Sequence, residues 1–163
     1  MNEQNEKAVW TVCHPNGRGT GSALKLTLHP AQGSASGYMT AKIAKQKTVA
    51  EYNGGKPVFA TFDWENPIEV RLCVDDLAQI VMVLRGQIES IEDGKGVFHR
   101  TREANMVIKF SHMIEPRPGY IFSVSKKPLD GDLTDAFIML RETEAVVLSF
   151  ALEHVFAALV FGE

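Results

Sequence analysis

The fold is decided by the stretch Gly37-Tyr38-Met39-Thr40-Ala41-Lys42-Ile43-Ala44-Lys45-Gln46-Lys47. A shortened copy returns in the second half as Gly119-Tyr120-Ile121-Phe122-Ser123-Val124-Ser125-Lys126-Lys127. The two Gly-Tyr pairs lie 82 residues apart in a chain of 163 residues. Each copy follows an alternating apolar segment and precedes another strand-like segment and a helix. Self-similarity of this length indicates a duplicated half-fold, whose halves bury their apolar faces against each other.

Hydrophobic periodicity in the first half predicts four strands followed by one helix. The expected strands cover residues 23–29, 38–48, 58–64 and 68–72, where apolar and polar side chains alternate. From Val74 onward the apolar spacing becomes helical, and Asp75 and Asp76 are well placed for the N-terminal helix dipole.

The second half repeats this order. Its expected strands cover residues 96–101, 105–114, 120–127 and 136–140. Thr143 and Glu144 begin a last helix whose apolar surface is wider than one stripe, so this helix is buried on two sides or packs against a partner chain. The expected fold class is therefore α+β: an internally duplicated ββββα-ββββα arrangement of two antiparallel four-stranded sheets packed with two helices.

Composition indicates one globular domain with an apolar fraction of 45% and a net charge of −3. We expect a flexible tail over residues 1–17 and a single domain over residues 18–163, built from repeats at about 18–90 and 95–163. The longest apolar run, residues 145–161, is interrupted by Glu153 and His154, which argues against a membrane span. The polar N-terminus does not resemble a signal peptide, and we expect a cytoplasmic protein, nucleoid-associated if it is bacterial.

No catalytic or metal-binding constellation is found in the sequence. The glycine-rich stretch 17–21 precedes a strand and lacks the helix and the GK[ST] ending of a phosphate-binding loop. The five histidines lie in different elements without metal-ligand spacing. Cys13 and Cys73 are 60 residues apart, and we expect small buried side chains rather than a disulfide or a metal site. We therefore expect no enzyme activity, no cofactor and no metal.

Aromatic rings interleaved with cations point to a different function. Tyr38 and Tyr120 hold equivalent positions in the two copies, and lysines follow each of them on the same strand. A sheet that offers flat rings and lysines is a platform for unstacked bases, although core packing and a solvated sheet face are the alternatives. The candidate nucleic-acid-binding residues are Lys25, Tyr38, Lys42, Lys45, Lys47, Arg100, Lys109, Tyr120, Phe122, Lys126 and Lys127.

Several motifs, in order, resemble those of the Whirly family of single-stranded-DNA-binding proteins. Phe62-Asp63-Trp64 is similar to the family's Tyr-Asp-Trp, and Phe98-His99 is similar to the Phe-His that opens its second sheet. The strand-to-helix junction at residues 70–77, the stretch from Val107 through Gly119 to Ser125, and the terminal Phe161-Gly162 follow in the same order. The resemblance covers residues 18–162. It implies two four-stranded sheets, each followed by a helix.

One motif departs from the family. Plant members carry Lys-Gly-Lys-Ala-Ala-Leu on the first strand, which is implicated in DNA binding and assembly, whereas this chain has Gly19-Thr20-Gly21-Ser22-Ala23-Leu24-Lys25-Leu26. Only Lys25 or Arg18 could replace the paired lysines.

The resemblance implies a sequence-tolerant single-stranded-DNA-binding protein in transcription regulation or DNA maintenance, assembled through its C-terminal helix as a homotetramer. Binding of single-stranded or guide RNA on the same sheet surface is one alternative, because stacking does not read the sugar. A structural interaction module that binds no nucleic acid is the other.

Overall fold

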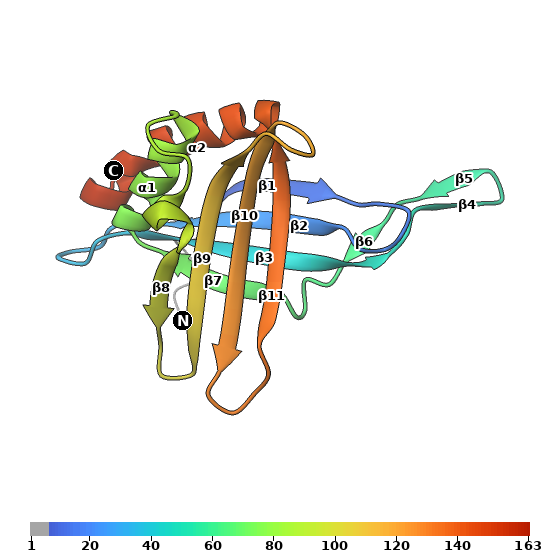
Figure 1. Cartoon of the computed structure of the whole chain (residues 1–163), viewed down its shortest axis with the longest axis horizontal. Coiled ribbons are helices and arrows are strands. Elements are labelled where there is room, and N and C mark those ends of the chain that lie inside the picture. Colours follow the sequence, from blue (N-terminus) through green and yellow to red (C-terminus); the bar gives the residue numbers. More distant parts are fainter. Residues whose placement is uncertain (1–6) are drawn as a thin grey trace.

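Each half of the chain forms an antiparallel sheet and ends in a helix in the computed structural model, which describes residues 7–163 (Figure 1). The first half contains β1 (Lys7–His14), β2 (Ser22–His29), β3 (Tyr38–Thr48), β4 (Glu51–Asn53), β5 (Lys56–Val58), β6 (Thr61–Phe62), β7 (Ile68–Leu72) and α1 (Val74–Leu84). After a 3-10 turn at Ile91–Gly94, the second half contains β8 (Val97–Arg100), β9 (Ala104–Met113), β10 (Gly119–Pro128), β11 (Thr134–Arg141) and α2 (Glu142–Phe161). The expected α+β fold, with two four-stranded antiparallel sheets and two helices, is confirmed.

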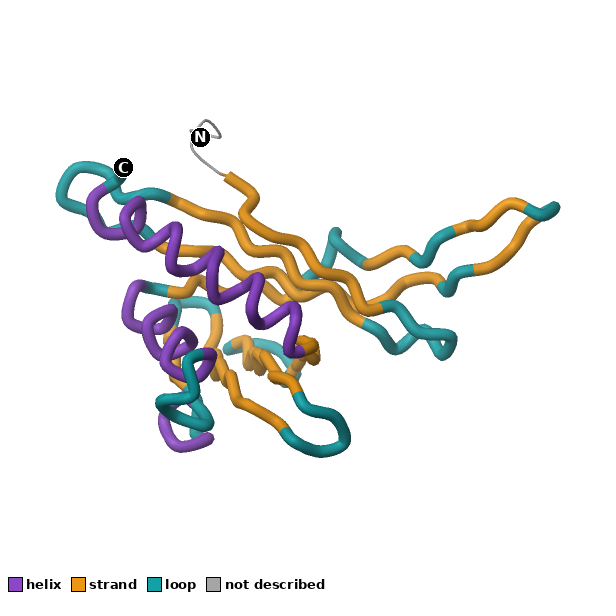
Figure 2. The backbone as a smooth tube through the Cα atoms, turned by 90° about the horizontal axis from the view of Figure 1, so that it is seen from above, coloured by secondary structure: helices purple, strands orange, loops and turns teal. Residues whose placement is uncertain are grey.

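The sheets cross each other, and the two helices pack side by side along the same side of them (Figures 1 and 2). Sheet 1 has the strand order β1-β2-β3-β7, and the short β6 pairs with the far end of β3. Sheet 2 has the order β8-β9-β10-β11. The β4–β5 hairpin belongs to neither sheet and projects away from the body of the protein (Figure 1).

Strand alternation decides which side chains enter the core. In β2, Leu24, Leu26 and Leu28 are buried, whereas Lys25 and Thr27 between them point away from the core. We call the buried side of each sheet its inner face and the opposite side its outer face. The inner faces and the helices leave a cavity of only about 20 Å³ between them, which is room for a single water molecule.

The first strand of sheet 1 corrects the expectation for residues 1–17. Residues 7–14 are not a flexible tail but β1, which pairs along the whole of β2. A register shift between Ala8 and Trp10 breaks the alternation that identifies a strand, which is why periodicity missed it. Residues 1–6 lie outside the described residues.

The strand expected over residues 58–64 is also wrong, because only β5 and β6 form there, separated by a loop. The first half still has four long strands because β1 supplies the missing one.

Helix α2 is buried along one stripe, formed by Leu148, Leu152, Val155 and Leu159. By length and composition it could also cross a membrane, but the core helix of a soluble protein passes the same test. Its C-terminal carbonyl groups accept the backbone N–H groups of the β2–β3 loop, at 2.9 Å from Ala31 and 2.8 Å from Gly37. The end of α2 is thereby anchored to sheet 1.

The glycine of each Gly-Tyr pair is required by a close backbone approach. A Cβ atom on Gly37 would lie 2.7 Å from the carbonyl oxygen of His29 and 2.9 Å from Cα of Leu159. A Cβ atom on Gly119 would lie 2.4 Å from the carbonyl oxygen of Leu140. The repeated glycines therefore have a packing role in both halves.

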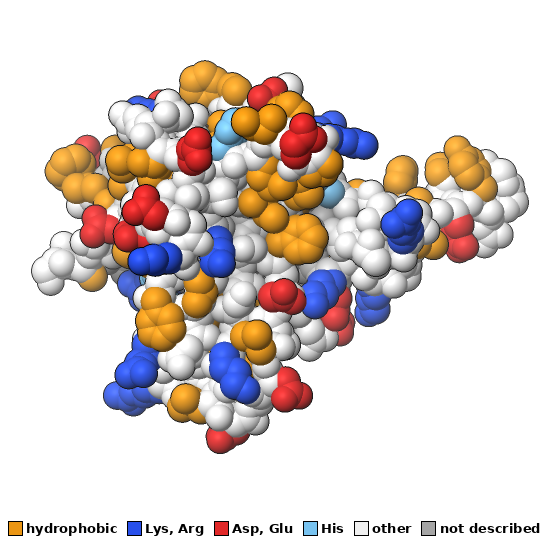
Figure 3. Space-filling view, viewed as in Figure 1, with side chains coloured by type: hydrophobic (Ala, Val, Ile, Leu, Met, Phe, Trp, Pro, Cys, Tyr) orange, Lys and Arg blue, Asp and Glu red, His pale blue; other side chains and the backbone are white. Residues whose placement is uncertain are grey.

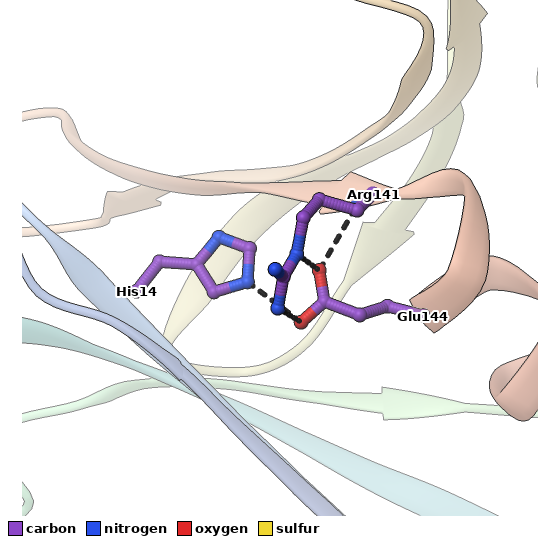
Figure 4. A network of polar contacts seen from close by, with 3 residues as sticks. All are labelled: His14, Arg141 and Glu144. Carbon is purple, nitrogen blue, oxygen red and sulfur yellow. Dashed lines mark hydrogen bonds and ion pairs between the residues drawn. The ribbon is translucent and has the colours of Figure 1, made fainter.

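Two histidine–carboxylate contacts join the halves reciprocally. His99 on β8 of sheet 2 places Nε2 3.0 Å from Oδ2 of Asp76 in the first turn of α1. His14 at the end of β1 of sheet 1 places Nε2 2.8 Å from Oε2 of Glu144 in the first turn of α2 (Figure 4). The first strand of each sheet is therefore tied to the helix of the other half.

The same two carboxylates cap their own helices. Asp76 accepts the backbone N–H of Cys73 at 2.9 Å, and Glu144 accepts the backbone N–H of Arg141 at 2.9 Å. Glu144 also accepts the guanidinium Nε–H of Arg141 at 3.2 Å (Figure 4). Burial raises the pKa of Glu144, whereas hydrogen bonds from Arg141 and His14 lower it. The hydrogen bonds together have the larger effect, so this pKa lies below its ordinary value.

Candidate nucleic-acid interface

The two outer faces are the open sheet surfaces of the protein, and they point in opposite directions because the inner faces meet in the core. A single linear ligand cannot lie flat on both outer faces of one protomer. Each face is therefore a separate candidate surface.

The outer face of sheet 2 carries two exposed aromatic rings. Phe98 on β8 is 59% exposed, and Phe137 on β11 is 54% exposed. They lie on the two edge strands. The usual spacing between neighbouring strands places these two edge strands roughly 14 Å apart. Lys109 on β9 lies between them, in line with Ser123 and Phe137 across the sheet. Figure 3 shows hydrophobic side chains over this face, with Lys and Arg side chains and also Asp and Glu side chains among them.

Three of the predicted cations belong to this face by strand alternation. Lys109 and Arg100 are exposed, and neither makes a hydrogen bond or ion pair with another side chain in residues 7–163. Lys127 is exposed as well, but its Nζ donates a hydrogen bond to the carbonyl oxygen of Gly131 at 2.6 Å. This face thus combines unpaired cations with flat rings, the two components of a single-strand platform.

The outer face of sheet 1 carries Lys25 and Lys42, and both have partners. The ammonium group of Lys25 lies 4.6 Å from the centroid of the Trp64 ring, within cation–π range. Lys42 Nζ lies 3.6 Å from Oε2 of Glu69 on the neighbouring strand. Both contacts are partly exposed, so each is weak enough for a phosphate to compete with it.

Tyr38 also lies on this face, but its ring is occupied on both sides. The His29 ring, from β2, stacks on it at a centroid distance of 4.4 Å and an interplanar angle of 11°. The guanidinium carbon of Arg71, from β7, lies 3.6 Å from the Tyr38 centroid. Because β2 and β7 flank β3, Tyr38 is sandwiched between these two groups. It is therefore not an open platform for a base.

Tyr120 does not hold the position equivalent to Tyr38. It lies on the inner face of sheet 2, half-buried, where its ring stacks on Phe110 at 5.7 Å and contacts His112 at 5.0 Å. Phe122 follows on the same face and is only 3% exposed, so its predicted role in base stacking is wrong. Lys126 also points to the inner face by strand alternation, and it is partly buried.

The remaining predicted cations, Lys45 and Lys47, lie at the far end of β3 and are exposed. Both alternate with Gln46 and so point to the side opposite Lys42. Figure 1 shows this end of β3 reaching beyond sheet 2. The three lysines of β3 thus do not form one cluster.

Most backbone N–H groups in and beside the glycine-rich turn at residues 17–21 already donate hydrogen bonds within the protein. The side-chain Oδ1 of Asn16 accepts the N–H groups of Arg18 and Thr20, each at 3.0 Å. Gln46 Oε1 accepts the N–H groups of Asn16 and Gly21 at 2.9 and 3.0 Å. Few backbone donors are left for an anion, so the turn is not a phosphate cradle.

Cys13 and Cys73 are exposed rather than buried as expected, and both are free. Partial burial of the sulfur raises the pKa of each thiol above its ordinary value, which disfavours the thiolate. Within residues 7–163, no three His, Cys, Asp or Glu side chains gather as a metal site would require.

Three outer-face residues are absent from the residues predicted by the sequence, namely Phe98, Phe137 and Arg71. Phe137 alternates with the buried Ala136 and Ile138, and Arg71 alternates with the buried Val70 and Leu72. Phe98 is exposed between the partly buried Val97 and His99. Strand alternation therefore places all three on an outer face, but none of them belongs to the repeated Gly-Tyr segments on which the prediction rested.

Comparison with solved structures finds the crystal structure of WHY1 from Arabidopsis thaliana, with a TM-score of 0.71 and 19% sequence identity. The match covers 94% of this chain and 87% of that one. A scan against protein-family models finds no match, and neither does a search of curated protein sequences. The resemblance to the Whirly family is thus confirmed in three dimensions: the chain has the fold of a Whirly protein.

Proposed function

We propose that this protein binds single-stranded DNA with little sequence preference, on the outer face of sheet 2. The observation that carries the proposal is the pair of exposed rings, Phe98 and Phe137, on either side of the unpaired Lys109. In this arrangement the rings stack on splayed bases, while Lys109 and Arg100 contact phosphates. The Whirly fold supports the choice of single-stranded DNA as the ligand.

Lys25, Lys42, Lys45, Lys47, Lys126 and Lys127 are the further phosphate-contact candidates. Lys25 and Lys42 would contact a nucleic-acid strand that lies on the outer face of sheet 1. Assembly into an oligomer could bring this face near sheet 2 of a neighbouring copy. Tyr38, Tyr120 and Phe122 are not assigned to base stacking, because their rings are covered or buried.

The test is fluorescence anisotropy with labelled single- and double-stranded oligonucleotides of mixed sequence over a salt series. We expect binding of single strands, with log Kobs falling by about 0.7 for each phosphate neutralised per unit of log salt. No binding of single strands at about 50 mM salt would refute the proposal. Stronger binding of an RNA competitor of equal length would favour the RNA alternative.

We also propose that α2 assembles the protein as a homo-oligomer, with the tetramer as the expected state. Five apolar side chains remain exposed on the helix face away from the buried stripe, namely Val146, Val147, Phe150, Val160 and Phe161. Light scattering coupled to size-exclusion chromatography measures the state directly. We expect Phe150→Glu with Phe161→Glu to yield monomers, whereas a wild-type monomer would contradict the proposal.

A role in transcription regulation or DNA maintenance, in the cytoplasm or on a bacterial nucleoid, is the cellular setting that we propose for this activity. The interaction-module alternative predicts that reversing the charge of Lys109 and Arg100 leaves the function intact. The DNA proposal predicts that the same change abolishes binding.

A further inference from the structure

The outer face of sheet 1 contains a shallow hollow of about 250 Å³ beside the Arg71–Tyr38–His29 stack. Its wall includes three hydroxyl-bearing side chains, Thr27, Tyr38 and Thr40, and the cationic side chains of Lys42 and Arg71. Glu69 is the one carboxylate that lines it, and this carboxylate lies 3.6 Å from Lys42.

Arg71 is held in place without using its hydrogen-bond donors. The carbon of its guanidinium group lies over the Tyr38 ring, 3.6 Å from the ring centroid. Among residues 7–163, no side-chain hydrogen bond or ion pair engages Arg71. A stacked guanidinium keeps its N–H edges available, and their fork matches two oxygens of a phosphate. The side-chain entropy that a flexible cation loses on binding is here already lost in the folded protein.

We infer that this hollow is a phosphate-binding subsite for the nucleic-acid backbone, in which Arg71 makes a bidentate contact with one phosphodiester and Tyr38 holds Arg71 in place. The inference rests on the proposed binding of single-stranded DNA and adds a second contact surface, on sheet 1. Lys42 is the second cation of the subsite, since its pairing with Glu69 is long and partly exposed. Tyr38 thus acts through Arg71 and does not stack on a base.

The experiment measures the affinity of full-length variants for a labelled single-stranded oligonucleotide over a salt series. Arg71→Gln is expected to weaken binding about tenfold and to reduce the salt slope by about 0.7, as for one lost phosphate contact. Arg71→Lys keeps the charge but loses the fork, so the salt slope stays while the affinity falls. Arg85→Gln is the matched control, because it removes an arginine on the helical side of the protein and is expected to leave binding unchanged.

The role of Tyr38 is tested by a double-mutant cycle. Tyr38→Phe keeps the ring and is expected to bind like the wild type. Tyr38→Leu frees Arg71 and should weaken binding severalfold. In a protein that already carries Arg71→Gln, Tyr38→Leu should cause no further loss of affinity. Additive losses would show that Tyr38 stacks on a base itself and would overturn its assignment. Circular dichroism of each variant checks that the fold is retained.

Inorganic phosphate distinguishes a backbone subsite from a pocket for a free phosphate. We expect phosphate to displace the oligonucleotide no better than sodium chloride of equal ionic strength. Saturable phosphate binding without DNA that is lost in Arg71→Gln would overturn the assignment to a nucleic-acid backbone. If the wild type binds single strands but Arg71→Gln binds them equally well, this inference alone fails. If the wild type binds none, the proposed function fails with it.

Discussion

The two halves of the molecule share a strand order and a capping arrangement, yet they turn their repeated tyrosines to opposite faces. Tyr38 lies on the outer face of sheet 1, between His29 and Arg71. Tyr120 lies on the inner face of sheet 2, stacked on Phe110. Because side chains alternate along a strand, a shift of one residue between the copies reverses every side chain. Equivalent positions in a repeat are therefore not equivalent positions on a surface.

The difference assigns different roles to the two sheets. Sheet 2 exposes unoccupied rings, Phe98 and Phe137, whereas sheet 1 uses its tyrosine to position a cation. A duplicated scaffold can in this way present a base-stacking surface on one side and a phosphate-binding surface on the other. Four measurements test the comparison of the two halves, taken in order of the size of the expected effect.

The largest effect is expected at the inner face of sheet 2. Phe122→Ala removes a buried ring and should lower the free energy of unfolding by about 3–5 kcal/mol, because the core cannot close over the cavity. Its neighbour Ser123 lies on the outer face, so Ser123→Ala should change stability by less than about 0.5 kcal/mol. Urea denaturation followed by circular dichroism measures both. A small stability loss with weakened DNA binding would return Phe122 to the stacking surface.

The next effect concerns the exposed rings. Phe98→Ala and Phe137→Ala should each weaken binding of single-stranded DNA by about 1–3 kcal/mol, because each removes one stacking platform. Stability should change by less than about 0.5 kcal/mol, since both rings are exposed. Tyr52→Ala, in the projecting hairpin, is the control with an exposed ring outside both sheets. An equal loss of affinity in that variant would mean that stacking is not confined to sheet 2.

The two histidine–carboxylate contacts should differ in strength. His99→Ala leaves the buried carboxylate of Asp76 with the backbone N–H and the thiol of Cys73 as its partners among residues 7–163, and should cost about 2 kcal/mol of unfolding free energy. His14→Ala should cost about 1 kcal/mol, because Glu144 keeps its hydrogen bonds from Arg141. Thermal or urea unfolding at pH 7 compares them. Equal costs would show that the two contacts are interchangeable.

The smallest effect is a pH dependence at Glu144. Its pKa in the folded protein lies below its ordinary value, so the folded state binds this proton less readily than the unfolded state. Its contribution to stability is therefore complete above the ordinary pKa and is lost as the pH falls through the lowered one. Glu144→Gln should flatten this part of the acid limb in a series of urea titrations from pH 7 to pH 3. Glu142→Gln, two residues earlier in the same turn, is the control, because it removes a carboxylate but leaves the Glu144 contacts in place. An unchanged acid limb in Glu144→Gln would contradict this prediction.

Much of the fold was predictable because local patterns carry it. Alternation located β2, β3, β7 and the strands of sheet 2, and helical spacing located α1 and α2. The sequence did not predict β1, because its register shift interrupts the alternation. The strand expected over residues 58–64 was wrong because that segment is largely loop. The site was less predictable, since the sequence around a lysine or an aromatic residue on a strand does not show which side chains contact it from the neighbouring strands. Arg71 gains its place over Tyr38 only because β7 pairs with β3.

The sequence by itself determined the two-half organisation, the α+β class and the positions of most elements, because these depend on the period of apolar residues along the chain. The tertiary structure decided which face of each strand is buried and which cations and rings meet. Tyr38 and Tyr120 follow the same glycine in the same motif, yet one is sandwiched on an open face and the other packs inside. The physical reason is that a face becomes inner or outer only when the second sheet packs against it.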